Sequence, residues 1–175
     1  MIRTLQAFDI KGKNVLIRAD LNVPMSGETI TNNFRIKASL PTIKTCIEAG
    51  ASVILMSHLG RPKGKEEQSL SLIPVGEELA GLLEMPIKFS ANCISTDAID
   101  TSISLKPGEI HLLENLRFYA EEEDNDTDFS SQLARHGNIY INDAFGTAHR
   151  SHASNVGVVP FFKNAGIGWL MDKEL

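Results

Sequence analysis

Short, continuous aliphatic runs recur along the chain, and segments with helical periodicity separate most of them. The first two runs are NVLIRADL at residues 14–21 and SVILMS at residues 52–57. A strand without polar alternation must be covered on both faces, as in parallel sheets with helices on each side. Strands that alternate with helices also imply βαβ units with right-handed crossovers. We therefore expect an α/β fold of three layers, with a mostly parallel β-sheet flanked by helices.

The same patterns predict the remaining elements. Apolar side chains recur at helical spacing in residues 35–50, 72–83 and 126–137, which are the expected helices. Further strands are expected at residues 86–89, 109–116, 138–143 and 165–170. Residues 91–104 have only a weak pattern, and no element is assigned to them. The final MDKEL looks like the start of another helix, so we expect the chain to be one part of a longer protein.

Composition excludes several classes of protein. The 175 residues, of which 42% are hydrophobic, are enough for one well-buried core. The net charge of −5 argues against binding of a nucleic-acid backbone, which usually requires a basic face. Cys46 and Cys93 lack the spacing of zinc ligands or of a redox motif. No apolar stretch approaches the roughly 18 residues of a membrane span, and no export signal is recognisable. We expect a cytoplasmic protein with no metal site, no membrane contact and no nucleic-acid partner.

Cationic and polar side chains follow the expected strands at their carboxyl ends, where open parallel sheets bind ligands. Alternation in the first strand puts Arg18, Asp20 and Asn22 on one side, and Ile17, Ala19 and Leu21 on the other. The later strands are followed by His58, Gly60, Arg61, Arg117, His149 and Arg150. Because the carboxyl ends of parallel strands lie along one edge of the sheet, we expect these side chains to converge.

The residue types indicate what such a site would bind. The planar guanidinium of arginine donates two parallel hydrogen bonds to a phosphate or carboxylate and keeps its charge. Asp20 and Asn22 suit hydroxyl and amide contacts, because a carboxylate would repel a bare phosphate. The combination favours a small phosphorylated hydroxy-acid or sugar.

Each of these residues also has a structural interpretation. A single arginine at a strand end often pairs with a carboxylate, and Glu114 or Asp143 could serve here. His58 could be a hydrogen-bonded structural histidine. The acidic run EEEDNDTD at residues 121–128 is most simply a solvated loop and helix start. GRPKGK and GIG lack residues that the P-loop and the dinucleotide fingerprint require, so neither supports a nucleotide site.

Five segments stand out between residues 18 and 154: RADLNVP, ITNNFRIKASLPTI, LMSHLGRPKG, LLENLRFYAEEE and NDAFGTAHRSHAS. In order and spacing they resemble the motifs of the phosphoglycerate kinase family. The resemblance implies a Rossmann-like α/β domain, the amino-terminal half of the enzyme, which binds 3-phosphoglycerate or 1,3-bisphosphoglycerate. It places this domain at residues 1–170 and the start of the interdomain connection at residues 171–175. The nucleotide-binding domain would be absent from this chain.

The resemblance also implies roles for individual residues. Asp20 and Asn22 would contact the carboxyl and hydroxyl end of the substrate, with Leu21 beside them. Arg35 would be the catalytic residue, close to the transferring phosphoryl group. The other implied substrate-binding residues are His58, Leu59, Gly60, Arg61, Arg117 and Arg150, and the last three arginines would hold the 3-phosphate. Arg18 and His149 would belong to a surrounding basic patch.

The implied activity is reversible phosphoryl transfer between 3-phosphoglycerate and ADP in glycolysis. Mg-ATP or Mg-ADP would bind to the carboxyl-terminal nucleotide domain of the same protein and not to this chain alone, which is expected to be inactive by itself. The complete enzyme is expected to be a monomer. A stand-alone, non-catalytic module that binds a small phosphorylated acid is the alternative.

Overall fold

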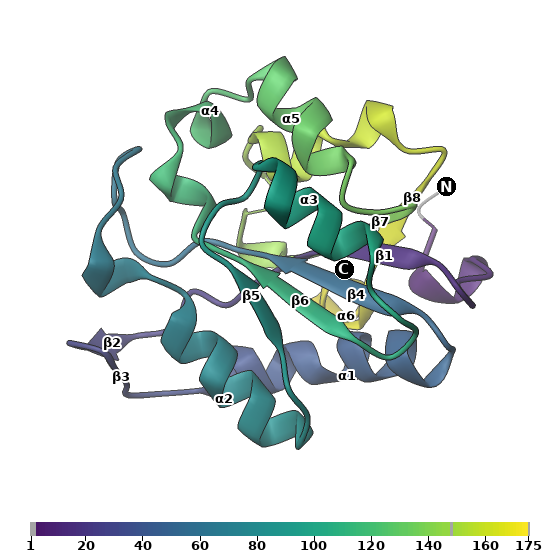
Figure 1. The fold of residues 1–175 in the computed structure, drawn as a ribbon, viewed down its shortest axis with the longest axis horizontal. Coiled ribbons are helices and arrows are strands. Elements are labelled where there is room, and N and C mark those ends of the chain that lie inside the picture. Colours follow the sequence, from purple (N-terminus) through teal and green to yellow (C-terminus); the bar gives the residue numbers. More distant parts are fainter. Residues whose placement is uncertain (1–2, 148, 175) are drawn as a thin grey trace.

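A computed structural model describes residues 3–147 and 149–174. Within these residues, six strands form one parallel sheet in the order β5-β6-β4-β1-β7-β8 (Figure 1). The strands are β1 (Asn14–Ala19), β4 (Ser52–Met56), β5 (Lys88–Ser90), β6 (Ile110–Leu113), β7 (Ile139–Asp143) and β8 (Asn164–Ile167). A short hairpin of β2 (Met25–Ser26) and β3 (Thr29–Ile30) is separate from the sheet. The parallel α/β sheet confirms the fold class expected from the aliphatic runs.

Helices cover both faces of the sheet (Figure 1). On one face lie α1 (Phe34–Glu48) and α2 (Ile73–Leu83), and on the other lie α3 (Thr96–Ile103), α4 (Ala120–Glu123) and α5 (Thr127–Ala134). The last helix, α6 (Trp169–Glu174), contacts α1 and β7. No helix among the described residues combines the length and the apolar character that a membrane crossing would need.

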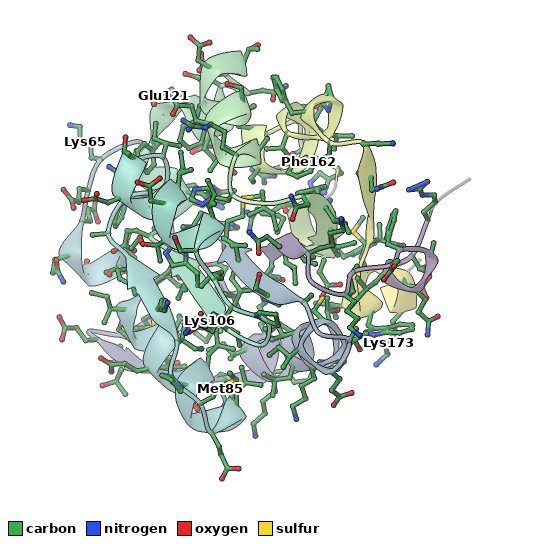
Figure 2. All side chains as sticks on the ribbon, turned by 45° about the vertical axis from the view of Figure 1, so that its right-hand side comes forward. Lys65, Met85, Lys106, Glu121, Phe162 and Lys173 are labelled. Atoms are coloured by element: carbon green, nitrogen blue, oxygen red, sulfur yellow. The ribbon has the colours of Figure 1, made fainter. Side chains whose placement is uncertain are left out.

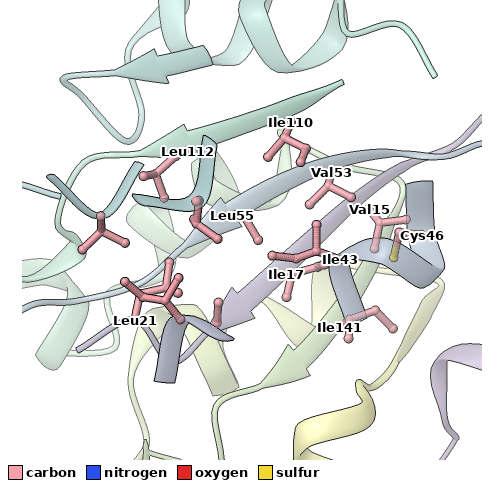
Figure 3. Packing of buried hydrophobic residues seen from close by; sticks show 14 of the residues in the cluster. Val15, Ile17, Leu21, Ile43, Cys46, Val53, Leu55, Ile110, Leu112 and Ile141 are labelled. Atoms are coloured by element: carbon pink, nitrogen blue, oxygen red, sulfur yellow. The ribbon is translucent and has the colours of Figure 1, made fainter. Parts of the chain in front are cut away.

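Each face of the sheet has its own hydrophobic core, because successive strand residues point to opposite faces. The cluster against α1 and α2 includes Ile17 and Val53 of the sheet and Ile43 of α1 (Figure 3). The cluster on the other face includes Leu16 of β1 and Phe129 of α5. The sheet is therefore buried on both sides, which is why its central strands could be aliphatic throughout.

Three expectations about the elements were wrong in part. The weakly patterned stretch contains α3, which Ser95 caps by accepting a hydrogen bond from Ala98 N at 3.1 Å. The strand expected at 109–116 ends at Leu113, because the chain then enters a 3₁₀ turn at Leu116–Phe118. The last strand ends at Ile167, and α6 begins at Trp169 instead of residue 171.

The acidic run at residues 121–128 is not wholly solvated. Glu121 extends into solvent (Figure 2), whereas the side chain of Glu122 is fully buried beneath α4. Asp126 caps α5 by accepting a hydrogen bond from Phe129 N at 2.9 Å. The run therefore supplies a helix start, as expected, together with one buried carboxylate that the pattern did not predict.

Candidate functional site

A pocket of about 240 Å³ lies at the carboxyl edge of the sheet. It is lined by Asp20, Asn22, Arg35, His58, Gly60, Arg61, Arg117, Gly146, Thr147 and Arg150. These residues come from the loops after β1, β4, β6 and β7 and from the first turn of α1. Strand ends separated by more than a hundred residues thus meet at one place, as the topology of an open parallel sheet requires.

The pocket brings together most of the residues expected from the sequence. The exceptions are Leu21 and Leu59, which are 0% and 1% exposed. Both belong to the hydrophobic core cluster on the α1 side of the sheet, where Figure 3 shows Leu21. Their backbones still organise the site, since Leu21 N donates to Ser57 Oγ and Leu59 O accepts from Asn115 Nδ2. The two leucines therefore fix the loops from below and do not line the pocket.

Gly146 and Thr147 line the pocket but were not expected from the sequence. They lie in a 3₁₀ turn directly after β7, three to four residues before Arg150. Their position just beyond a strand end was the available signal. Only Arg150 was predicted to bind the substrate from this loop, because its charge indicates anion binding more directly than glycine or threonine does.

Two loops at the pocket floor are joined by Asn22. Its Oδ1 accepts a hydrogen bond from Gly60 N at 2.9 Å, which ties the loop after β1 to the loop after β4. Gly60 has φ +62, and a Cβ there would approach Leu70 Cδ2 to 2.8 Å. The positive φ favours glycine at this turn, and a larger residue would also have to displace the Leu70 side chain.

Carboxylates do not neutralise most of the arginines. Among residues 3–147 and 149–174, Arg35 forms the pocket's one ion pair, with Nη1 3.6 Å from Asp20 Oδ1, and it also donates to Asn22 O at 2.6 Å. Glu114 instead accepts from Ser71, Leu72 and Asn115, while Asp143 accepts from Met171 N. Neither carboxylate is the arginine partner that the structural interpretation required.

Arg117 is the most deeply buried of the arginines that line the pocket. Its side chain is 7% exposed, and its Nε is buried with no hydrogen-bond partner among the described residues. Burial lowers the pKa of Arg117, and the neighbouring Arg18 and Arg150 lower it further against the opposing effect of Glu123. A buried donor without an acceptor is costly, and no carboxylate among the described residues forms an ion pair with this guanidinium.

The two expected members of a surrounding basic patch, Arg18 and His149, do not line the pocket. Arg18 is 1% exposed and does not line the pocket; it lies beneath His58, with Nη2 2.8 Å from His58 Nδ1. His149 is exposed and is outside the lining. The expectation of a surface patch is thus wrong for Arg18, because its side chain turns inward to buried partners.

Metal ligands and reactive thiols do not form a second site in the part of the chain that the structure describes. It contains no group of three or more histidine, cysteine, aspartate or glutamate side chains arranged to hold a metal ion. Cys46 and Cys93 are buried and free, and burial raises the pKa of Cys46 to about 12.

Comparisons with known proteins agree with the motifs. The family model described as phosphoglycerate kinase matches residues 5–175. Phosphoglycerate kinases of Chlorobium limicola and Borreliella afzelii are 51% and 47% identical over 174 residues, which is 99% of this chain and 44% of each relative. The chain therefore spans less than half the length of these relatives.

Solved structures give the same result. The structure of phosphoglycerate kinase from Coxiella burnetii matches with a TM-score of 0.91 and 38% identity, over 99% of this chain and 43% of that one. The enzyme from Pyrococcus horikoshii OT3 matches with a TM-score of 0.90 and 36% identity, over 99% of this chain and 44% of that one. With the motifs, the fold and the end-to-end match in agreement, this chain belongs to the phosphoglycerate kinase family.

Proposed function

We propose that this chain is the substrate-binding half of a phosphoglycerate kinase, and that its pocket binds 3-phosphoglycerate or 1,3-bisphosphoglycerate. Residues 1–170 would form the substrate domain, and residues 171–175 would begin the connection to a nucleotide domain that binds Mg-ATP or Mg-ADP. The complete enzyme would be a cytoplasmic monomer that transfers a phosphoryl group reversibly in glycolysis.

The observation that carries the proposal is the set of arginines without carboxylate partners. Arg61, Arg117 and Arg150 line one pocket and form no ion pair among the described residues. Each charge-assisted hydrogen bond to a desolvated phosphate contributes about 1.5–3 kcal/mol. Three such residues therefore supply a large part of the roughly 8 kcal/mol of a micromolar complex. A phosphate monoester is the ligand that best uses this arrangement.

The remaining lining residues suit the other end of the substrate. Asp20 is held near Arg35 by their ion pair, and Asn22 Oδ1 is already occupied by Gly60 N. The Asp20 carboxylate can accept a hydrogen bond from a hydroxyl group, and the amide nitrogen of Asn22 can donate to an oxygen. These contacts discriminate a hydroxy-acid from inorganic phosphate.

Phosphoryl transfer to a carboxylate needs no general base, because a carboxyl group with a reference pKa of about 3.5 is ionised at neutral pH. The reaction needs in-line placement of the two oxygens and cancellation of charge on the transferring group. Arg35 is 50% exposed in its side chain and lies at the rim of the pocket, where a second domain could approach. We assign it this role, which is worth about 10³–10⁵ in rate when arginine fingers perform it.

Calorimetric titration tests the binding half of the proposal. The chain is titrated with 3-phosphoglycerate at low ionic strength, with 2-phosphoglycerate and inorganic phosphate as competing ligands. We expect selective binding of 3-phosphoglycerate, and a loss of at least about 100-fold in the Arg61→Ala, Arg117→Ala double variant from the hydrogen bonds removed. Arg135→Ala, an exposed arginine outside the pocket, is the matched control and should bind normally.

Two further results decide between the kinase and the non-catalytic binding module. A coding sequence that continues past residue 175 into a glycine-rich nucleotide domain supports the kinase, whereas a stop codon there supports the module. Absence of binding by a folded chain, verified by circular dichroism, would contradict both.

A further inference from the structure

Arg18 connects the pocket to the buried interior through His58. The guanidinium Nη2 of Arg18 is 2.8 Å from His58 Nδ1. A guanidinium has donors only and stays protonated in proteins, so His58 Nδ1 must accept this hydrogen bond and cannot carry a proton. A neutral His58 ring therefore has its proton on Nε2, and no acceptor for this N–H exists within the described residues.

The orientation of Arg18 is itself fixed by buried partners from other elements. Its Nη1 donates to Ala19 O at 2.7 Å, and its Nε donates to Ser154 Oγ at 2.9 Å. Glu122 of α4 accepts hydrogen bonds from both Ser154 N and Ser154 Oγ. Because Ser154 donates its one hydroxyl proton to Glu122, its oxygen is left to accept from Arg18. The buried carboxylate also balances the buried guanidinium, since Glu122 opposes the lowering of the Arg18 pKa by burial.

The groups around His58 favour the same neutral state. The charged and titratable side chains that act on it are Arg18 on β1, Arg117 in the turn after β6, Arg35 on α1, and His152. All of these oppose a positive charge on His58. Burial and then these neighbours lower the pKa of His58 to about 2.

We propose that Arg18 is a positioning residue for the pocket: it holds His58 as the Nε2–H tautomer, so that His58 offers the ligand one directed N–H donor and no charge. The inference rests on the proposed function for its ligand, but the geometry of the pair is independent of it. The arginines of the lining supply the charge, while His58 supplies direction. Ser154 and Glu122 fix Arg18 from below, which explains why a carboxylate of the acidic run is buried.

Nuclear magnetic resonance tests the tautomer directly. Histidine in the 175-residue chain is labelled with ¹⁵N, and two-bond ¹H–¹⁵N correlations distinguish Nδ1–H, Nε2–H and imidazolium rings; a His58→Gln variant assigns the signal. We expect His58 to be in the Nε2–H form and not to titrate between pH 5 and 8. An Nδ1–H ring or an imidazolium at pH 7 would overturn the proposal, and this result needs neither a ligand nor a change to Arg18.

A variant then tests the cause. Arg18→Met keeps a long side chain and removes every donor, so we expect the Nδ1–H tautomer of His58 to appear beside the Nε2–H form at pH 7. Affinity for 3-phosphoglycerate should fall at least tenfold, whereas Arg61→Ala should weaken binding without changing the His58 tautomer. Arg135→Met is the matched control and should leave the His58 signal unchanged. A His58 signal in folded Arg18→Met identical to that of the unaltered chain refutes the role of Arg18. If this variant does not fold, the tautomer measured in the unaltered chain decides the proposal.

The two proposals fail in different ways. If His58 has the expected tautomer but 3-phosphoglycerate does not bind, the positioning role of Arg18 stands and the proposed substrate is wrong. If 3-phosphoglycerate binds while His58 is an Nδ1–H ring, the substrate stands and the positioning role is wrong.

Discussion

A buried chain of hydrogen bonds joins β5, β6, α3 and the end of α5, and Ser102 is its central link. His136 Nε2 is 2.7 Å from Cys93 O, and a carbonyl only accepts, so this nitrogen carries the proton. The neutral ring then accepts at Nδ1 from Ser102 Oγ at 2.6 Å. Ser102 in turn accepts from His111 Nδ1 at 2.8 Å, and His111 Nε2 accepts from Ser90 Oγ at 2.7 Å. Each hydrogen bond in this network therefore has a defined donor and a defined acceptor.

Ser102→Ala breaks this chain at two bonds at once. His136 Nδ1 loses its donor and His111 Nδ1 loses its acceptor, and both rings are 0% exposed, as is Ser102. A buried polar group without a partner costs about 1–3 kcal/mol. Two such groups predict a loss of about 2–6 kcal/mol in the free energy of unfolding, which is a large share of the stability of a domain this size.

Urea denaturation followed by circular dichroism measures the effect, with the slope of the transition used to confirm that the folded state is unchanged. Ser104→Ala is the matched control, because Ser104 is exposed just after α3 and its Oγ donates to Asp100 O. The control should stay within about 0.5 kcal/mol of the unaltered chain. If Ser102→Ala loses no more than Ser104→Ala, the assignment of the hydrogen-bond chain is incorrect.

Three further predictions concern pH, helix stability and catalysis. Burial lowers the pKa of His111 to about 4, so the neutral ring stabilises the fold fully above the unfolded pKa of about 6.5, and this stabilisation is lost as pH falls toward 4. The free energy of unfolding should therefore fall by about 2 kcal/mol between pH 7 and 5 from His111 alone, and a urea midpoint that does not change over this range would contradict this prediction. Gly81 lies exposed in α2, and an added Cβ there would meet nothing within 4 Å, so Gly81→Ala should raise the free energy of unfolding by about 1 kcal/mol, and a loss in the same urea assay would show an unrecognised contact. Arg35→Ala in the complete enzyme should lower kcat far more than it weakens 3-phosphoglycerate binding, and equal losses in steady-state kinetics and calorimetry would remove its catalytic assignment.

The elements that were predicted correctly are those whose burial is apolar and regular. The central strands are covered on both faces, so their aliphatic runs identified them directly. Helix α3 was missed because its buried face includes the polar Ser102, which breaks the hydrophobic period. Its capping serine, Ser95, was visible in the sequence, but a single cap before a short segment carries little weight.

The sequence by itself determined which side chains reach the edge of the sheet, because strand ends and residue alternation are local properties. Arg61, Arg117 and Arg150 could therefore be predicted to meet, and the structure brings them to one pocket. Arg35, which lies in α1 and not at a strand end of the sheet, was placed there only by the family resemblance. Only the tertiary structure decided that Arg18 turns inward, because its partner Ser154 lies 136 residues away along the chain. Whether a strand-end arginine faces solvent or a buried carboxylate depends on which distant segment covers that face of the sheet, and alternation within the strand contains no information about it.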